Sequence, residues 1–535
     1  MTPLDQLRTA LEDAAADVRG GKDAPKGRPT LERPPKPDFG DYSSNAAMLL
    51  APVLGEKPRE VAQRIGAAVA DRLGDQVDRV DIAGPGFVNL FLADSWYADS
   101  LAAILRAGEG YGGGGAARPE AVNVEFVSSN PTGPVHLGHA RNAAYGDAVA
   151  RLLAFHGHRV SREFYVNDGG SQIESYAEAL QARARGEEPA EYLGDYVADF
   201  AARIPDAAGG DPGMVGRAGV ELALEWARTT LERFRVQDFD TWFHERALYE
   251  AHPPSPSPIE RTLDALKARG VTYEAEGALW LRSSDFGDDK DRVLVKSDGT
   301  YTYLAPDIAY HQDKRERGFE RLVDVWGADH HGYVQRMKAA YAALGGDPDA
   351  LDLLIMQFVN LVREGEPVSM SKRAGEFITL DDLIDAIGVD AARWYLLARS
   401  HDTTIEVDLE LATRESADNP VYYVQYAHAR IAGILERATG GPDPVAHHPL
   451  EPAERALVKK LVAFPAEVSE AAARRAPHRI ATYALDLARD FAGFYETCKV
   501  VGSDQEPFRL ALTDATRGVI ARALDLLGVE APASM

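Results

Sequence analysis

Cysteine is almost missing from this sequence, because Cys498 is the one cysteine among 535 residues. A single thiol cannot close an internal disulfide or build a cysteine-rich zinc site, so we expect no structural zinc and a reducing environment. No apolar run approaches the ~20 residues that cross a bilayer, and residues 1–21 are amphipathic rather than basic and then apolar. We therefore expect a cytoplasmic protein with no membrane partner.

Positive charge is also in short supply. The 58 Lys and Arg face 83 Asp and Glu, which gives a formal net charge of −25. Non-specific binding to nucleic acid depends on clustered Lys and Arg, so the composition argues against it and leaves open only a local basic strip. With 45% hydrophobic and 26% charged residues, the chain is typical of globular proteins and long enough for several domains.

The pattern of apolar residues predicts three domains. Residues 1–115 mix helical and strand-like segments and end near a run of four glycines, which indicates a small α+β domain and a flexible boundary. Residues 116–388 alternate β-rich runs with helical windows, which favours an α/β domain with a doubly wound, parallel, Rossmann-like sheet. Insertions are expected over about 174–290. Residues 389–535 have helical spacing throughout and predict an all-α bundle.

Several elements of the second domain can be placed. We expect strands at 121–127, 159–166, 321–327 and 354–362, helices near 138–156, 308–318 and 332–344, a helical stretch over 174–250 and a hairpin over 271–283. In such a sheet, ligands bind at the carboxyl ends of the strands.

Two histidines follow the strand predicted at 121–127. His136 and His139 lie one helical turn apart at the start of a predicted helix, where free N–H groups and the helix dipole favour anions. Gly138 has no side chain, so a flat base can approach the backbone closely. Imidazoles beside a phosphate can donate hydrogen bonds to oxygens that gain charge during in-line displacement. A metal-binding pair or a coincidence of helix capping is the alternative interpretation.

A second candidate lies in the segment VSMSKRAGEFITL, residues 368–380. Lys372 stands in a loop that contains Ser and Gly, and its ammonium can meet a pyrophosphate leaving group. For an isolated MSKR, a solvated surface loop is the better interpretation. The two segments together are far more specific than either alone.

These segments resemble the two signatures of class I aminoacyl-tRNA synthetases. The surrounding sequence, at 125–147, 326–340, 369–385, 388–400 and 419–431, resembles arginyl-tRNA synthetases in particular. One departure is Ser369, which stands where the common form of the second signature has a lysine, so the loop depends on Lys372. The resemblance implies ATP-dependent ligation of L-arginine to tRNA(Arg) through an arginyl adenylate, with release of AMP and pyrophosphate. It also implies that ATP acts with Mg²⁺ and that the protein holds no metal of its own.

The resemblance also implies the roles of individual residues. The catalytic set is His136, Gly138, His139 and Lys372, and ATP would also contact Met370 and Ser371. Trp326 and Gly327 would adjoin the adenine, although a tryptophan there is also typical of a core.

Arginine is distinguished from lysine by acceptors that suit its planar, five-donor guanidinium. By resemblance, the guanidinium would contact Tyr303, Asp307 and Glu125, and the α-amino and carboxylate groups would contact Ser128, Ser129, Asn130 and His139. Asp329, His330 or Gln335 would complete this pocket. The alternatives are that Glu125 pairs with a structural lysine and that Tyr303 belongs to the core.

The third domain begins with Asp390-Ala-Ala-Arg393, which is similar to the Asp-Ala-Leu-Arg pattern of the family's anticodon-binding domain. The resemblance places Tyr495 and Met535 against anticodon bases and Asn89 against a base of the D-loop. Lys499, one helical turn beyond Tyr495, adds positive charge that could contact tRNA or lie on a solvated face. Tyr495 packed between helices is the alternative. A basic cluster formed by Arg474, Arg475, His478 and Arg479 is either the local strip for tRNA or a solvated face. We expect a monomer.

Three other functions fit parts of this sequence. They are another class I synthetase, such as one for cysteine or glutamate, a small-molecule nucleotidyltransferase with the same histidine motif, and a catalytically silent tRNA-binding protein. The lone Cys498 opposes the zinc-dependent cysteine enzyme, and the acids favour a cationic substrate over glutamate. The helical third domain has no purpose in a small-molecule enzyme. The intact histidine motif and Lys372 argue against a silent protein.

Overall fold

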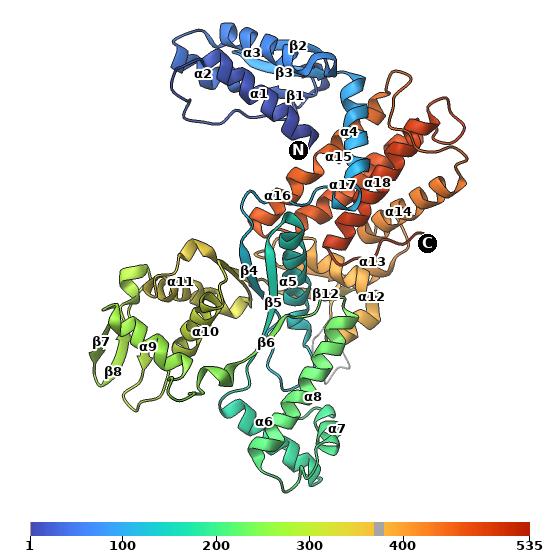
Figure 1. The fold of residues 1–535 in the computed structure, drawn as a ribbon. Coiled ribbons are helices and arrows are strands. Elements are labelled where there is room, and N and C mark those ends of the chain that lie inside the picture. The colour runs from blue at the N-terminus through green and yellow to red at the C-terminus, as the bar shows by residue number, and fades with distance from the viewer. Residues whose placement is uncertain (1, 369–378) are drawn as a thin grey trace.

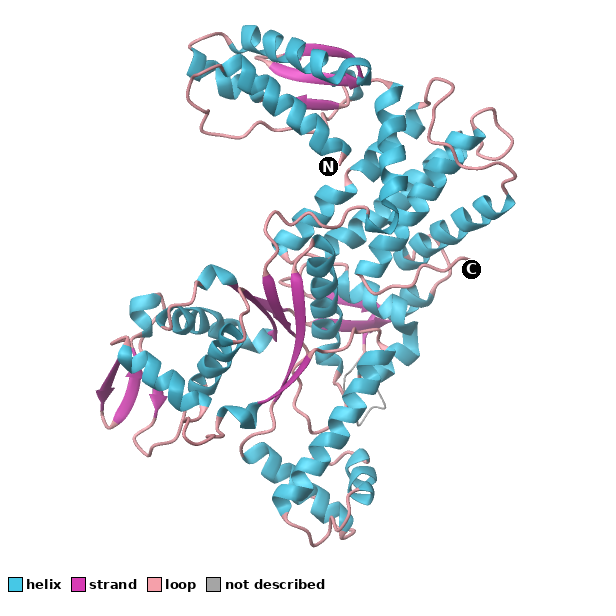
Figure 2. Cartoon of the chain, in the orientation of Figure 1, coloured by secondary structure: helices cyan, strands magenta, loops and turns pink. Residues whose placement is uncertain are grey.

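The computed structural model describes residues 2–368 and 379–535. An elongated molecule results, with the N-terminal part at one end, a sheet domain in the middle and a helical bundle beside it (Figure 1). Two insertions project from the sheet domain, one helical and one containing three short strands (Figure 2).

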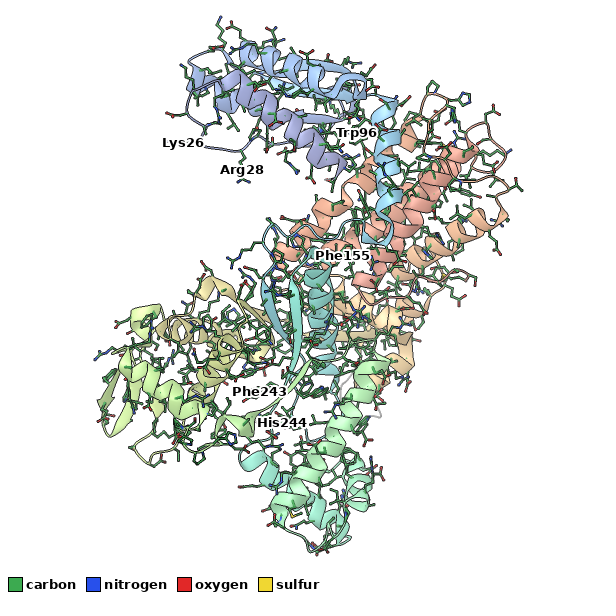
Figure 3. The ribbon with its side chains drawn as sticks, viewed as in Figure 1. Lys26, Arg28, Trp96, Phe155, Phe243 and His244 are labelled. Atoms are coloured by element: carbon green, nitrogen blue, oxygen red, sulfur yellow. The ribbon has the colours of Figure 1, made fainter. Side chains whose placement is uncertain are left out.

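The N-terminal part packs helices against a small antiparallel sheet. Strands β1 (Tyr42–Ser44), β2 (Val77–Ala83) and β3 (Phe87–Leu92) pair in the order β1-β3-β2. The helices are α1 (Pro3–Arg19), α2 (Ala46–Leu54), α3 (Pro58–Leu73) and α4 (Asp94–Ala107). Trp96, labelled in Figure 3, is buried near the start of α4 and packs edge-on against Tyr42 and Tyr97.

The central sheet is wholly parallel. Its strands are β4 (Ala121–Glu125), β5 (Arg159–Val166), β6 (Thr241–His244), β10 (Arg321–Gly327) and β11 (Leu351–Met356). They pair in the order β11-β10-β4-β5-β6, so the direction of winding reverses between β4 and β10. In an open sheet of this kind, the crevice outside the strand ends at this reversal is the usual place for a ligand.

Helices cover both faces of this sheet. Successive residues of β10 alternate, with Leu322 in one hydrophobic core and Val323 and Val325 in the other. Helix α5 (Leu137–His156) packs in the core of Val323, whereas α10 (Leu304–Glu316) and α11 (Val334–Ala343) pack in the core of Leu322. The expected Rossmann-like α/β class is thereby confirmed.

The insertions follow β5 and β6. Helices α6 (Ser171–Ala184), α7 (Tyr196–Arg203) and α8 (Pro212–Arg233) form the first. The second contains α9 (Pro258–Ala268) and the strands β7 (Thr272–Ala275), β8 (Ala278–Leu281) and β9 (Arg292–Val295). Strands β7 and β8 are the predicted hairpin, and β9 adds a third antiparallel strand to it.

Helices dominate the C-terminal part. They are α12 (Leu380–Leu397), α13 (Leu409–Thr413), α14 (Pro420–Arg437), α15 (Pro452–Val462), α16 (Phe464–Arg474), α17 (His478–Thr497) and α18 (Glu506–Leu526). Gly388 kinks α12 with a φ of 78°, a conformation that glycine adopts without the cost of a Cβ. One strand, β14 (Ile405–Asp408), interrupts these helices and pairs with β12 (Val359–Arg363), which also pairs with β13 (Glu366–Pro367).

Two strand predictions need correction. The single strand predicted at 354–362 is wrong, because the chain leaves the central sheet after Met356 and starts β12, in another sheet, at Val359. A continuous apolar run carries no signal for such a break. The helical stretch predicted over 174–250 contains β6, a four-residue edge strand that is stabilised by pairing with β5. Among the described helices, none is both long and apolar enough to cross a membrane.

Candidate functional site

A cavity of about 600 Å³ opens at the reversal of the central sheet. The turn after β4, the start of α5, the end of β10 and the connection from β11 to β12 contribute to its walls. Its polar and aromatic lining includes Ser128, His136, His139, Asn142, Trp326, Asp329, His330, Gln357, Phe358 and Asn360. His136 and His139 therefore share one cavity with residues of strands β10, β11 and β12.

The two histidines hold the positions expected from the motif. His136 is the N-cap of α5, and its Nδ1 accepts a hydrogen bond of 3.0 Å from the backbone N–H of Gly138. This bond leaves Nε2 as the nitrogen that carries the proton of the neutral ring. Gly138 is exposed, and a Cβ there would approach only its neighbour His136. Burial lowers the pKa of both histidines, so both rings are neutral at pH 7.

His139 differs from His136 in its partners. Its Nδ1 is buried and has no hydrogen-bond partner among the described residues. A buried polar atom without a partner is costly, and such atoms in native structures call for an explanation. Because the ring also lines the cavity, a ligand that fills the cavity supplies one.

The second predicted segment adjoins the same place. Met370, Ser371 and Lys372 lie outside the described residues. The last two residues of the segment are described: Thr379 forms a β-bridge with His136, and the N–H of Leu380 donates to the carbonyl of Val135 at 2.9 Å. The end of this segment is therefore next to the histidine motif.

The turn after β4 has an unusual backbone. Val127 and Ser128 have φ values of 68° and 43°, which are rare for residues with a side chain and cluster at functional sites. The hydroxyl of Ser128 donates to Glu125 at 2.9 Å and accepts from the N–H of Tyr165 at 3.2 Å. Asn130 accepts from Asn167 at 3.2 Å, and Ser129 between them is half-buried. The turn is thus held against the end of β5.

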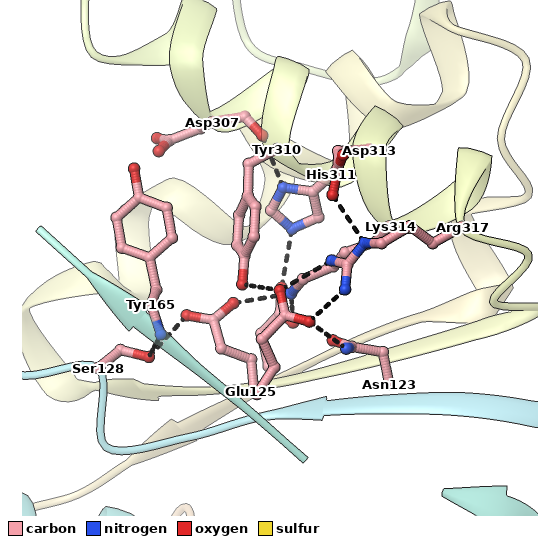
Figure 4. Close-up of polar contacts among 12 residues, drawn as sticks. Asn123, Glu125, Ser128, Tyr165, Asp307, Tyr310, His311, Asp313, Lys314 and Arg317 are labelled. Carbon is pink, nitrogen blue, oxygen red and sulfur yellow. Dashed lines mark hydrogen bonds and ion pairs between the residues drawn. The ribbon is translucent and has the colours of Figure 1, made fainter. Parts of the chain in front are cut away.

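A fully buried ionic cluster lies beneath α10 (Figure 4). The Nζ of Lys314 is 2.7 Å from Glu125 Oε2 and 2.8 Å from Asp324 Oδ1. The imidazole of His311 contacts the other oxygen of Asp324 at 2.8 Å and the carbonyl oxygen of Asp307 at 2.7 Å. Both of these partners are acceptors, so both ring nitrogens must donate and His311 is a cation. We name Glu125, His311, Lys314 and Asp324 the buried ionic cluster.

The pKa values agree with this assignment. Burial alone lowers the pKa of Lys314 and of His311, but the neighbouring carboxylates outweigh burial and raise both. Burial raises the pKa of Asp324, and Lys314 and His311 reverse this and hold it well below its usual range. The prediction that Glu125 contacts the guanidinium stays a prediction, and both of its oxygens already have protein partners, Lys314 and Ser128.

Asp307 lies at the edge of this cluster and faces a different set of groups. Its carboxylate accepts a hydrogen bond of 2.5 Å from the hydroxyl of Tyr333, and Tyr165 points toward it from β5 (Figure 4). Burial raises the pKa of Asp307, partly offset by Tyr333 and His311. No described cation forms an ion pair with the Asp307 carboxylate within 4 Å. A substrate cation is therefore a suitable partner for it.

Glu245 is a member of this region that the motifs did not indicate. It directly follows His244, the last residue of β6, and His244 is labelled in Figure 3. The Glu245 carboxylate accepts a hydrogen bond of 3.1 Å from Tyr249. Burial raises its pKa, and the negative charge of Asp307 adds to this rise. The two acids, Glu245 and Asp307, thus lie close enough to influence each other electrostatically. A correct prediction of β6 would have placed Glu245 at the carboxyl edge of the sheet.

The remaining residues that were predicted for the arginine site lie in three different places. Tyr303 is 91% exposed at the N-cap of α10, so the alternative that it belongs to the core is wrong. Asp329 and His330 line the cavity. Gln335 is exposed on α11 and donates to the carbonyl of Gly287 at 2.9 Å, away from the cavity lining.

Comparisons with known proteins agree with this geometry. Residues 101–197 and 254–432 match the class I (R) catalytic domain of tRNA synthetases, residues 5–92 match the arginyl-tRNA synthetase N-terminal domain, and residues 424–535 match the DALR anticodon-binding domain. The chain is 45% identical over 531 residues to the arginine--tRNA ligase of Geobacillus thermodenitrificans, with 94% of each chain covered. The chain belongs to the arginyl-tRNA synthetase family.

Further relatives extend the likeness over the whole chain. The arginine--tRNA ligase of Frankia alni is 46% identical with all of both chains covered. The solved Thermus thermophilus arginyl-tRNA synthetase superposes with a TM-score of 0.76 at 26% identity, covering 99% of this chain and 100% of that one.

In this member of the family, the helical bundle presents an exposed aromatic surface. Tyr495 of α17 and Tyr426 of α14 are 37% and 39% exposed. The guanidinium of Arg430 lies 4.9 Å from the ring centre of Tyr426 and 5.6 Å from that of Tyr495. Lys499 and Met535 are also exposed. Tyr495 therefore does not pack wholly between helices.

Two other candidates for tRNA contact are less accessible. Asn89 is 3% exposed and its Oδ1 accepts a hydrogen bond of 2.7 Å from Ser43, so a base would have to uncover it. The basic cluster is not a free strip, because three of its members are paired with acids. The pairs are Arg474 with Glu470, Arg475 with Asp352 and Arg479 with Glu467.

Proposed function

We propose a division of roles for the reaction that this chain catalyses as a family member, the ATP-dependent ligation of L-arginine to tRNA. The observation that carries the proposal is the juxtaposition at the sheet reversal. Ser128 of the turn after β4 lines the cavity together with the histidine motif, and its hydroxyl accepts a hydrogen bond from the N–H of Tyr165, whose side chain points toward Asp307 (Figure 4). An amino acid bound to the acids by its side chain thus directs its carboxylate toward the nucleotide.

The first step forms the adenylate. An oxygen of the arginine carboxylate attacks the α-phosphorus of ATP, and the bond from that phosphorus to the bridging oxygen breaks, which releases pyrophosphate. His136 and His139 donate hydrogen bonds to phosphate oxygens whose negative charge grows in the transition state. Gly138 leaves room for the base beside them. Lys372 neutralises negative charge on the leaving pyrophosphate, as Mg²⁺ bound to ATP would also do, and Met370 and Ser371 contact ATP.

The arginine side chain is held by charge and by geometry. Asp307 and Tyr303 contact the guanidinium, with Glu245 as a second acid on the same side. Ser128, Ser129, Asn130 and His139 hold the α-amino and carboxylate groups, and Asp329, His330 or Gln335 completes the pocket. Glu125 supports the turn through Ser128. An ammonium would leave acceptors unpaired, and sites built to bind a polar group reject analogues that lack it by ~10⁴ or more.

The second step transfers arginine to tRNA. A ribose hydroxyl of the 3′-terminal nucleotide attacks the carbonyl carbon of the adenylate, and AMP leaves. Residues 1–115 hold the tRNA body through Asn89, residues 116–388 carry the chemistry, and residues 389–535 hold the anticodon. Tyr495 stacks on an unpaired base, and Lys499 and Met535 flank it. The chain works in the cytoplasm as a monomer.

A charging assay tests this proposal. Purified protein, total tRNA and ATP are incubated with each of the twenty amino acids, and aminoacylated tRNA is measured. We expect arginine alone to be attached, and only when ATP and Mg²⁺ are present. Charging of cysteine or glutamate, adenylation of a small molecule without tRNA, or no charging by folded protein would each favour one of the other functions.

A further inference from the structure

Arg141 is a buried charge that the reaction scheme does not use. It lies on α5 two residues after His139 and is 1% exposed. Its guanidinium donates to three backbone carbonyls, those of Gln357 at 2.9 Å, Thr403 at 2.8 Å and Ser400 at 2.8 Å. Within the described ranges 2–368 and 379–535, no carboxylate lies at ion-pair distance from it.

These carbonyls belong to two connections that meet behind the cavity. Gln357 joins β11 to β12, and Gln357 and Phe358 line the cavity. Ser400 and Thr403 join α12 to β14. The connections also bind one another, because the N–H of Gln357 donates to His401 at 2.9 Å and the N–H of Ile405 donates to Phe358 at 3.0 Å. We name residues 356–360 the cavity wall.

Placing a charge here is unfavourable in itself. A buried charge that meets only neutral carbonyls loses hydration without the gain of an ion pair. Burial accordingly lowers the pKa of Arg141 to about 10. What the residue provides is geometry, because the planar guanidinium can hold several acceptors at fixed angles and a lysine cannot.

We propose that Arg141 is a positioning residue for the nucleotide, which holds the cavity wall at a fixed distance from the histidine motif. The inference rests on the proposed function, in which ATP occupies this cavity. The start of helix α5 carries His136 and His139, the wall carries Phe358 and Asn360, and all four residues line the cavity. Arg141 is the direct link between the two, so the cavity is formed before ATP enters. The proposed ligands of the arginine side chain, Asp307 and Glu245, lie outside the cavity lining and have no hydrogen bond with Arg141.

The test compares Arg141→Met and Arg141→Lys with the wild type in arginine-dependent ATP–pyrophosphate exchange with tRNA present. We expect Arg141→Met to raise KM for ATP by about 10-fold or more, from the loss of three charge-assisted hydrogen bonds. KM for arginine should change by less than about 2-fold. Arg141→Lys should restore part of the loss, since it keeps the charge and one donor direction.

Arg151→Met is the matched control on the same helix. Arg151 pairs with Asp147 at 2.8 Å and donates to the carbonyl of Arg235 at 2.8 Å, and it is not in the cavity lining. We expect its Tm to fall while KM for ATP stays at the wild-type value. Thermal unfolding of each variant distinguishes a protein that does not fold from a folded protein whose cavity wall is displaced.

The proposal is overturned if folded Arg141→Met keeps a wild-type KM for ATP, or if both KM values rise together. Should Arg141→Met not fold, Arg141→Lys decides, because a wild-type KM for ATP in that variant contradicts the need for a planar fork. Failure of the wild type to exchange pyrophosphate with arginine would instead refute the proposed function.

Discussion

Helices α5 and α10 both bring polar side chains to the carboxyl edge of the central sheet, but they differ in how those side chains are partnered. On α5, His139 lines the cavity with a buried Nδ1 that has no partner among the described residues. On α10, His311 and Lys314 have acceptors for their donors within the protein. A group that is buried and unsatisfied is suited to a ligand, and one that is satisfied is part of the scaffold.

Asp307 has one group that belongs to the scaffold and another that is open to a ligand. Its backbone carbonyl belongs to the scaffold, since it accepts from His311. Its carboxylate accepts a hydrogen bond from Tyr333 and lies close enough to Glu245 to raise the pKa of that acid. The two cations of the buried ionic cluster pair with Glu125 and Asp324, so neither forms an ion pair with the Asp307 carboxylate. The comparison therefore predicts that scaffold residues change stability and ligand-facing residues change kinetics.

The largest effect is expected for Lys314→Met. This change leaves Glu125 and Asp324 buried without their shared cation, and removal of one partner of a buried ion pair costs about 3–5 kcal/mol. Thermal unfolding, together with amide exchange of β4 and β10, measures the loss. The double variant Lys314→Met/Asp324→Asn removes a charge of each sign and should regain much of the stability. If Lys314→Met unfolds like the wild type, the cluster is not a scaffold.

His139→Ala should act on the reaction rather than on the fold. We expect kcat to fall by ~10² or more, because a hydrogen-bond donor to the transition state is lost. The Tm should change little. His156→Ala at the last residue of the same helix is the control, since His156 lies at the opposite end from the cavity. An unchanged kcat in His139→Ala would remove this residue from the mechanism.

Asp307→Asn should raise KM for arginine by about 10- to 100-fold, the cost of losing charge-assisted hydrogen bonds to the guanidinium. KM for ATP should stay near the wild-type value. Asp313→Asn is matched on the same helix, where Asp313 pairs with Arg317 at 2.7 Å. A normal KM for arginine in Asp307→Asn would show that Glu245 or Glu125 provides the selectivity alone.

The smallest effect is a pH dependence of arginine binding. Burial raises the pKa of Asp307, and only the ionised carboxylate attracts the guanidinium. KM for arginine should therefore rise a few-fold as the pH falls through this raised pKa, above the range of an ordinary Asp. Measurement of KM between pH 5 and 8 tests this, as an order-of-magnitude expectation from the direction of the shift. The same rise in Asp307→Asn would assign it to another group.

Much of the fold was predictable because it depends on local pattern. The strands at 159–166 and 321–327 occur with the predicted bounds, and α5 begins within the histidine motif as expected. The histidines could be assigned because a strand, a turn and a helix N-terminus follow one another in 121–139. The wrong predictions concern strands whose bounds are set by pairing with neighbouring strands rather than by the local sequence pattern. Strand β6 is four residues long, and its sequence does not reveal the register it shares with β5.

The acidic residues show most clearly what could not be predicted from the sequence. The sequence alone does not distinguish the roles of Glu125, Glu245 and Asp307, because each could be a substrate ligand or a partner of a structural cation. Lys314 is 189 positions from Glu125 and takes it as a partner. Glu245 belongs to no sequence motif. It lies near Asp307 because β6 ends at the same edge of the sheet as β4 and β10.

The sequence by itself determined the family, the succession of strand, turn and helix in residues 121–156, and the place of the histidines at the start of α5. These features follow from residues close together in the chain, where spacing and helix capping act directly. Only the tertiary structure decided which carboxylates are neutralised and which stay available to a cation. Charge pairing in a protein interior depends on distances of a few ångströms between distant segments, and these exist only after the strands have been ordered in the sheet.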